Sequence, residues 1–110
     1  MNIDPTNTIC TVIVTVNGEP SDMEFVVGHA SGGLNRFSEY EGFIAGATHV
    51  SEDGGKVVQY LQWESRKAHE TCMNDPVWAE DPSSRRFMEL MDSGAIVVDV
   101  RTYDIAALTD

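Results

Sequence analysis

The side chains best suited to chemistry lie on one predicted strand and in the helix that follows it. Alternate residues of the run 56–64 (KVVQYLQWE) point to the same side of a strand, so Gln59 and Trp63 share a face. His69 comes six residues after Trp63, in the second turn of the predicted helix, where its imidazole can reach the same space. An apolar slot with one amide, one indole and one imidazole is typical of a small-molecule site. Leu61, on the same strand face, is expected to bind substrate through its apolar side chain.

Each of these side chains also has a structural interpretation. A tryptophan on a half-buried strand usually belongs to the core, and a helical histidine is more often exposed or structurally satisfied. A buried glutamine needs hydrogen-bond partners, which makes Gln59 mildly indicative of a ligand. In the functional interpretation, Trp63 walls the pocket, Gln59 hydrogen-bonds a substrate oxygen, and His69 transfers a proton, since its ordinary pKa of about 6.5 suits neutral pH.

Two adjacent arginines in the last predicted helix are further candidates. Either Arg85 or Arg86 could hold an anionic oxygen of the substrate, because a guanidinium presents several donors in a fixed plane. The alternative is that both are solvated and pair with Glu80 or Glu89 about one helical turn away.

Several familiar catalytic patterns are absent from the sequence. The three histidines (His29, His49 and His69) show no metal-binding spacing, and no Cys/His pattern indicates zinc. There is no GxGxxG or P-loop, and no serine has the glycine-flanked elbow of a hydrolase. We therefore expect a site without a metal or a tightly bound cofactor.

Length and charge limit the class of protein. The 110 residues predict one domain over 1–110, and 18 acidic against 7 basic residues give a net charge of −11. Nucleic acid and anionic membrane surfaces are therefore not expected as partners. Cys10 and Cys72 fall in apolar runs and predict reduced, buried thiols in a cytoplasmic protein. The start of the sequence shows neither a secretory signal nor a transmembrane pattern.

The elements that must position these residues alternate along the chain. Strands are predicted over residues 8–16, 42–50, 56–64 and 95–103, and the glycine-containing turn 51–55 joins the middle two as a hairpin.

Three helical segments lie between the strands. The first is expected to start near Met23, with Ser21 or Asp22 as its cap, and to kink or break at residues 31–33 (SGG). Ser65 is expected to cap the second, and Asp81 the third, with proline at its first position.

This order, βαββαβ, predicts an α+β ferredoxin-like fold with helices on one face of an antiparallel sheet. The other sheet face is expected to be too apolar for water and to pack against the sheet of a second copy. The residues assigned to that outer face are Val12, Val14, Val58, Tyr60, Ile96 and Val98.

The middle of the chain resembles a known family. Residues 41–44 (EGFI), 51–55 (SEDGG) and 57–65 (VVQYLQWES) are similar to the "PGF" opening, the "S-x-D-G" turn and the "Y-x-Q-W-x-S" strand end of the antibiotic biosynthesis monooxygenase family. Similarity is greatest to its small actinorhodin-type members. The match covers residues 41–68, about a quarter of the chain.

The resemblance implies a dimeric α/β barrel that performs oxygen chemistry without flavin, haem or metal. By position, Trp63 matches the family's pocket tryptophan and Tyr60 its strand tyrosine, a substrate-binding residue. Gln59 stands where those members have asparagine, and His69 where they have a pocket tyrosine. The resemblance further implies that one of Arg85 and Arg86 corresponds to their helix arginine.

We therefore expect a cytoplasmic, homodimeric, cofactor-independent monooxygenase that oxidises an aromatic small molecule (anthrone, phenol or quinol-like) with O₂. Two alternatives stay open: a non-oxidative enzyme on the same scaffold, such as a polyketide cyclase or lactone isomerase, and a non-catalytic small-molecule binding domain.

Overall fold

The β-branched run near the start of the chain forms an inner strand of a four-stranded antiparallel sheet. In the computed structural model, which describes residues 9–107 and 109, this strand is β1 (Cys10–Gly18). It pairs with β3 (Lys56–Trp63) on one side and β4 (Ile96–Tyr103) on the other, and β2 (Phe43–Val50) completes the order β2-β3-β1-β4. The predicted α+β class, antiparallel sheet and central hairpin are confirmed.

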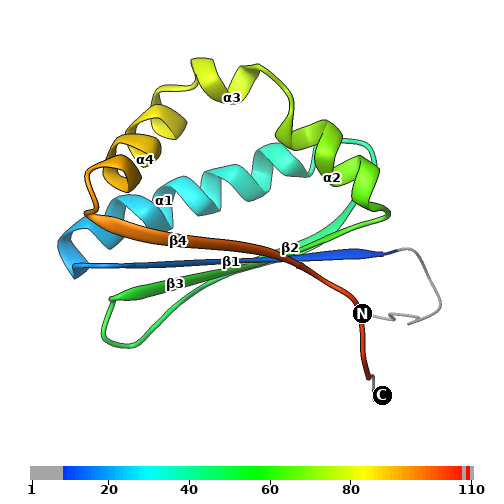
Figure 1. Ribbon diagram of the computed structural model, residues 1–110, viewed down its shortest axis with the longest axis horizontal. Coiled ribbons are helices and arrows are strands. Elements are labelled where there is room, and N and C mark those ends of the chain that lie inside the picture. The colour runs from blue at the N-terminus through cyan, green and yellow to red at the C-terminus, as the bar shows by residue number, and fades with distance from the viewer. Residues whose placement is uncertain (1–8, 108, 110) are drawn as a thin grey trace.

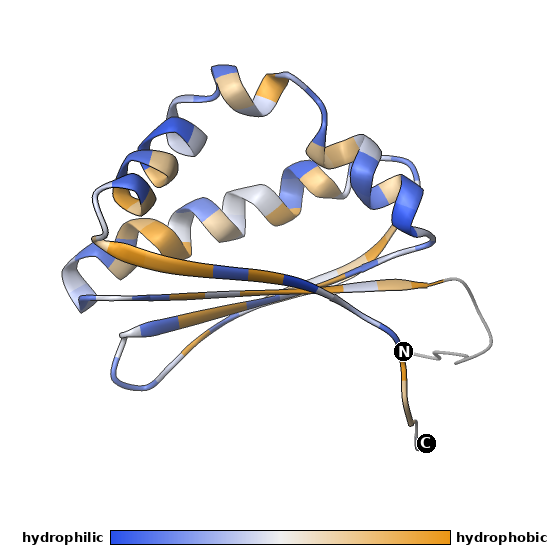
Figure 2. Ribbon diagram, viewed as in Figure 1, coloured by the Kyte–Doolittle hydropathy of each residue, from blue (hydrophilic) through white to orange (hydrophobic). Residues whose placement is uncertain are grey.

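All the helices lie over one face of this sheet (Figure 1). They are α1 (Pro20–Phe37), α2 (Arg66–Met73), α3 (Val77–Glu80) and α4 (Pro82–Asp92). Hydrophobic and hydrophilic residues alternate along α1 and α4 in Figure 2, as expected for helices that pack one side on a sheet. Buried Met23 and Val26 anchor α1.

The first helix differs from the prediction in its N-cap and in its continuity. It begins at Pro20 with Glu19 as the N-cap and no side-chain capping bond, so the expected Ser21 or Asp22 cap is wrong. Proline presets the backbone angle of a first helical turn, which explains the earlier start. The helix also runs unbroken through its glycines to Phe37, because its packing on the sheet outweighs their weak propensity.

The other helix boundaries follow the predicted capping chemistry. The Ser65 side chain accepts a bond from the Ala68 N–H at 3.1 Å, and Asp81 accepts one from the Ser84 N–H at 2.9 Å. The short α3 was not predicted. It forms where Asp75 accepts from the Val77 N–H at 3.0 Å, directly after α2 ends.

The core between the layers divides into two clusters of buried residues. One gathers beneath α1 and α4 (Val16, Met23, Val26, Val57, Leu90 and Ile96), and the other near α2 (Cys10, Val12, Leu61, Trp63 and Cys72). Val14 packs against both clusters and pairs across the sheet with Gln59. The boundary between the clusters therefore falls at the middle of the sheet.

The same register corrects the expected outer sheet face. Val12, Val14, Ile96 and Val98 pack in or against the clusters under the helices, so of the six residues assigned outward only Val58 and Tyr60 face away. Alternation places them with Ile13 and Val97, which is 66% exposed.

Candidate active site

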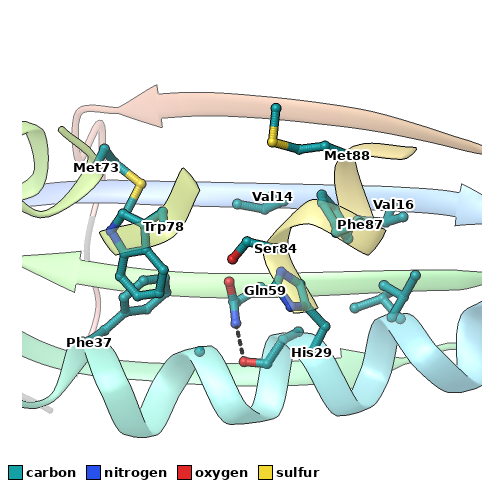
Figure 3. A pocket seen from close by; sticks show the side chains of 14 residues that line it. Val14, Val16, His29, Phe37, Gln59, Met73, Trp78, Ser84, Phe87 and Met88 are labelled. Atoms are coloured by element: carbon teal, nitrogen blue, oxygen red, sulfur yellow. Dashed lines mark hydrogen bonds between the residues drawn. The ribbon is translucent and has the colours of Figure 1, made fainter. Parts of the chain in front are cut away.

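A cavity of about 210 Å³ occupies the boundary between the two core clusters (Figure 3). Its floor is formed by strand residues, and its walls come from α1, α2, α3 and α4. The apolar lining consists of Val14, Val16, Val26, Ala30, Gly33, Phe37, Val57, Met73, Trp78, Phe87 and Met88. Three polar side chains interrupt this surface: His29, Gln59 and Ser84. An apolar cavity with few polar groups is the usual form of a small-molecule site.

The Gln59 amide is fixed by hydrogen bonds that its nitrogen donates. Nε2 donates to the main-chain oxygen of Ala30 at 2.9 Å and to the Thr48 hydroxyl at 3.4 Å. The first of these bonds is drawn in Figure 3, where the amide oxygen points the opposite way, into the cavity. Gln59 is only 8% exposed, so its Oε1 is a largely buried acceptor at the cavity surface.

The His29 imidazole stacks with two phenyl rings. Its centroid lies 5.9 Å from that of Phe25 and 4.9 Å from that of Phe87, both in stacked geometry. Its Nδ1 lies 2.7 Å from the hydroxyl oxygen of Ser83. Burial lowers the pKa of His29, an effect that the Asp81 carboxylate opposes and the Arg36 guanidinium reinforces. The ring is therefore neutral at neutral pH.

A polar network at the start of α4 supports the cavity wall. The Ser84 hydroxyl and N–H both donate to Asp81, whose pKa these bonds lower, and Arg36 pairs with the same carboxylate at 3.0 Å. The Arg36 guanidinium also lies 4.2 Å above the Trp78 ring. The Trp78 indole N–H donates to the Cys72 carbonyl at 2.7 Å. Trp78 is thus held from both sides.

A second hollow of about 170 Å³ adjoins the cavity. The two share His29, Gly33 and Trp78, and the hollow is otherwise lined by Gly28, Gly32, Arg36, Asp81 and Ser83. Exposed glycines line this hollow, which therefore reaches the surface. His29 consequently stands between an apolar interior and a polar, solvent-facing depression.

Of the side chains singled out in the sequence, Gln59 lines the cavity. Trp63 is fully buried behind it, with its ring centroid 6.1 Å from that of Phe37 and 5.0 Å from that of Phe43. No described group accepts a hydrogen bond from the Trp63 indole. His69 lies against Trp63 at 5.9 Å, and burial lowers its pKa. Leu61 belongs to the same cluster.

The remaining predicted residues lie away from the cavity. Tyr60 is on the outer sheet face, where its hydroxyl accepts a bond from the Gln62 amide at 3.0 Å. Arg85 and Arg86 are exposed on α4; the first reaches the Glu80 carbonyl at 3.5 Å and the second pairs with the Glu89 carboxylate at 3.4 Å. For Arg86 this is the surface pairing that was the structural alternative, whereas Arg85 meets Glu80 only through its main-chain carbonyl.

The sequence reasoning missed His29, Ser84 and Trp78 as cavity residues. One signal was available for the first: Val26, His29, Gly33 and Phe37 recur at helical spacing and so share one face. The expected break at the glycines obscured that face. Ser84 and Trp78 reach the cavity through α3 and the start of α4, whose path depends on tertiary packing.

Two further features follow from the described part of the chain. Within residues 9–107 and 109, no group of three or more histidine, cysteine or acidic side chains is arranged to hold a metal ion. No described helix is both long enough and apolar enough to cross a membrane.

Comparison with known proteins finds similarity in structure. No protein-family model matches the chain, and neither does any curated protein. A monooxygenase from the gene ActVA-Orf6 of Streptomyces coelicolor, solved with nanaomycin D, is 28% identical with a TM-score of 0.57, and the match covers 97% of this chain and 96% of that one.

Two other solved structures are more distant in sequence but superpose better. SnoaB, a cofactor-independent oxygenase from Streptomyces nogalater, has a TM-score of 0.66 at 15% identity, over 93% of this chain and 96% of its own. A proposed antibiotic biosynthesis monooxygenase from Deinococcus radiodurans has a TM-score of 0.70 at 8% identity, over 92% and 96%. The chain therefore shares the fold of these proteins over almost its whole length.

Proposed function

We propose that the protein is a cofactor-independent monooxygenase that oxidises a small hydroxylated aromatic compound with O₂. The observation that carries this proposal is the cavity itself: it combines aromatic walls with the inward-pointing oxygen of Gln59. It lies in a fold shared with a cofactor-independent oxygenase and with a monooxygenase solved with a small molecule.

The overall reaction needs no external reductant. When a phenol becomes a quinone, one ring carbon exchanges its hydrogen for an oxygen atom of O₂, and the hydroxyl group loses its own hydrogen. These two hydrogens leave with the second oxygen atom as water, so the substrate supplies all four electrons. The protein's contribution is to bind the aromatic ring, stabilise the oxyanion that reacts with O₂, and exclude water.

The size of the cavity narrows the proposed substrate. Pockets for drug-sized ligands usually measure about 300–1,000 Å³, and this one measures about 210 Å³. We therefore expect compounds with one or two rings, such as quinols and naphthols, to react faster than three-ring anthrones. The aromatic rings of Phe37, Trp78 and Phe87 would stack on them or meet them edge-on.

Roles for the buried residues behind the wall follow from their contacts. We propose that Gln59 accepts a hydrogen bond from the substrate hydroxyl. Trp63 acts through Phe37, which it supports from behind, and His69 supports Trp63 in turn. Trp63→Phe and His69→Ala should each lower turnover by disturbing the wall. No role in the site is proposed for Tyr60, Leu61, Arg85 or Arg86.

An oxygen-electrode assay tests the proposal directly. The purified protein, treated with a chelator and given no added cofactor, is mixed with a panel of quinols, naphthols and anthrones. O₂ uptake stoichiometric with quinone formation is expected, and heat-denatured protein is the control. Product formed at the same rate under argon would overturn the proposal in favour of a non-oxidative enzyme on this scaffold. Tight binding without any product would favour a binding domain.

We also propose that a second copy covers the outer sheet face, as the resemblance implies. That face carries the apolar side chains of Ile13, Val58, Tyr60 and the largely exposed Val97, with the Asp99–Arg101 ion pair beside them on the edge strand β4. Two such sheets packed together would give the dimeric barrel.

A further inference from the structure

His29 lines the cavity, a position at which packing alone does not require a histidine. Its ring stacks with Phe25 and with Phe87, and it lines the apolar cavity beside Gln59 and Ser84. Figure 3 shows the imidazole, the Gln59 amide oxygen and the Ser84 hydroxyl directed toward the same space. A ligand hydroxyl that bonds to Gln59 would therefore lie near this ring.

The two ring nitrogens of His29 have different surroundings. Nδ1 lies 2.7 Å from the hydroxyl oxygen of Ser83, which lines the outer hollow and not the cavity. Because that contact occupies Nδ1, Nε2 is the nitrogen available to a ligand. If Nδ1–H donates to Ser83, Nε2 carries the free lone pair of a neutral imidazole and can accept a proton.

The surroundings of His29 suit a group that is neutral at rest and becomes protonated only during the reaction. The charged groups that act on it are Asp81, at the N-cap of α4, and Arg36, on its own helix. The side chains that face it from β3 and α4 (Gln59, Ser83, Ser84 and Phe87) are uncharged. Burial keeps the ring neutral before the reaction, and the Asp81 carboxylate favours the imidazolium once it forms.

We propose that His29 is the base of this site: a substrate hydroxyl group that first donates to Gln59 Oε1 turns about its C–O bond toward Nε2, which takes the proton. Ser83 is a positioning residue that holds Nδ1–H. The substrate O–H bond breaks and its electron pair stays on the oxygen. A new N–H bond forms at Nε2, so a neutral pair becomes a phenolate and an imidazolium. The imidazolium Nε2–H then faces the phenolate, and its proton later leaves on the reduced oxygen atom of O₂ as water, which restores the neutral ring with its hydrogen on Nδ1.

This inference rests on the proposed function, since the phenolate is the species that O₂ oxidises, but the two can be tested apart. The proton transfer itself needs no O₂. The full-length protein is titrated under argon with 4-nitrophenol, whose anion absorbs at longer wavelength than the neutral form. Wild type is expected to shift the ionisation of bound 4-nitrophenol to lower pH. His29→Phe keeps an aromatic ring beside Phe25 and Phe87 but has no nitrogen, and should abolish that shift.

Turnover gives the second readout. With the best substrate of the panel, His29→Phe should lower kcat by about 100-fold or more, as loss of a general base does. It should also remove the acid limb of the kcat/KM profile, whose midpoint is expected below the 6.5 of an ordinary histidine. Ser83→Ala should lower kcat less and displace that limb, and Ser83→Thr should restore it. Glu24→Gln, which is exposed on α1 and does not line the cavity, is the control.

The outcomes separate the two proposals. Wild-type ionisation of 4-nitrophenol without any O₂ uptake would keep the base and remove the monooxygenase. O₂ uptake that survives in His29→Phe, with an unchanged acid limb, would remove the base and keep the monooxygenase. Loss of the ionisation shift in His69→Ala but not in His29→Phe would overturn the inference in favour of the other histidine.

Discussion

The side-chain amide of Gln59 on β3 donates a 2.9 Å hydrogen bond to the main-chain carbonyl of Ala30 on α1. This bond ties the sheet to the helix directly under the cavity and determines which end of the amide meets a ligand. Because the nitrogen is engaged, the oxygen faces inward, as Figure 3 shows. The site therefore favours ligands that donate a hydrogen bond, such as phenols, over ligands that only accept one, such as quinones.

Replacing Gln59 with leucine tests that preference. The variant keeps the apolar volume but loses the inward acceptor, so the affinity for 1-naphthol should fall by about tenfold, the value of one neutral hydrogen bond. The affinity for naphthalene, which has no hydroxyl group, should hardly change. Stability should fall by only about 1 kcal/mol, because the Ala30 carbonyl keeps its helical partner. Calorimetric titration checks this, and equal weakening for both ligands would contradict it.

A second prediction concerns a contact between the segments that follow α1 and α2. The Tyr40 hydroxyl donates to the Asp75 carboxylate at 2.6 Å, which lowers the pKa of Asp75 and raises that of Tyr40 to about 12. A carboxyl with a lowered folded-state pKa stabilises the fold above its ordinary value near 3.8, and this contribution disappears as the pH falls through the lowered value.

Tyr40→Phe should therefore melt below wild type at pH 7, and the difference in Tm should shrink as the pH drops under about 3.8. At the alkaline end, the wild-type advantage should be lost between the ordinary tyrosine pKa of about 10 and about 12. Circular dichroism melts over this pH range give the measurement. Tyr103→Phe, on the exposed end of β4, is the control, and a Tm difference independent of pH would contradict the prediction.

A third prediction pairs two glycines with opposite outcomes. Gly42 has a φ of +89°, and a Cβ there would lie 2.6 Å from the Ala68 side chain, so Gly42→Ala should destabilise the protein by about 2 kcal/mol or more. Gly28 lies within α1 with no atom within 4 Å of an added Cβ. Gly28→Ala should therefore stabilise by up to about 1 kcal/mol. Urea unfolding measures both, and the same sign for the two variants would be the contrary result.

Local chemistry predicted the parts of the fold that depend on neighbouring residues. Strand alternation placed Gln59 and Trp63 on one face, and Ser65 and Asp81 were identified as caps from residue type alone. The continuity of α1 was not predictable in this way, because the burial of Met23 and Val26 against the sheet decides it. That one misjudged helix is also why His29 was not recognised.

The candidate site depended more strongly on tertiary structure. Spacing allowed the His69 side chain to reach back toward the strand, and it does so, but it meets Trp63 behind the cavity wall. Whether the His69 ring lines the cavity or lies behind its wall depends on how α2 packs on the sheet. Similarly, Arg85 and Arg86 are on the predicted helix, yet the orientation of α4 turns them to solvent and presents Ser84 and Phe87 to the cavity.

The last prediction concerns the outer sheet face. Val58 pairs with Thr15 on one side and His49 on the other, which puts it near the middle of that face. A lysine there would have to lose its hydration if two sheets packed together, at a cost of several kcal/mol, whereas on a free surface it would cost little. Val58→Lys should therefore convert a dimer into a folded monomer at micromolar concentration.

Light scattering coupled to size exclusion measures this, with wild type expected at twice the chain mass. Met91→Lys is the matched control, since it places the same charge on the exposed side of α4, away from the sheet face, and should stay dimeric. A wild-type monomer at the same concentration would contradict the proposed barrel. The cavity lies between the sheet and the helices of one chain, so Val58→Lys should still bind 1-naphthol. If binding is lost together with the dimer, the second copy helps to shape the site.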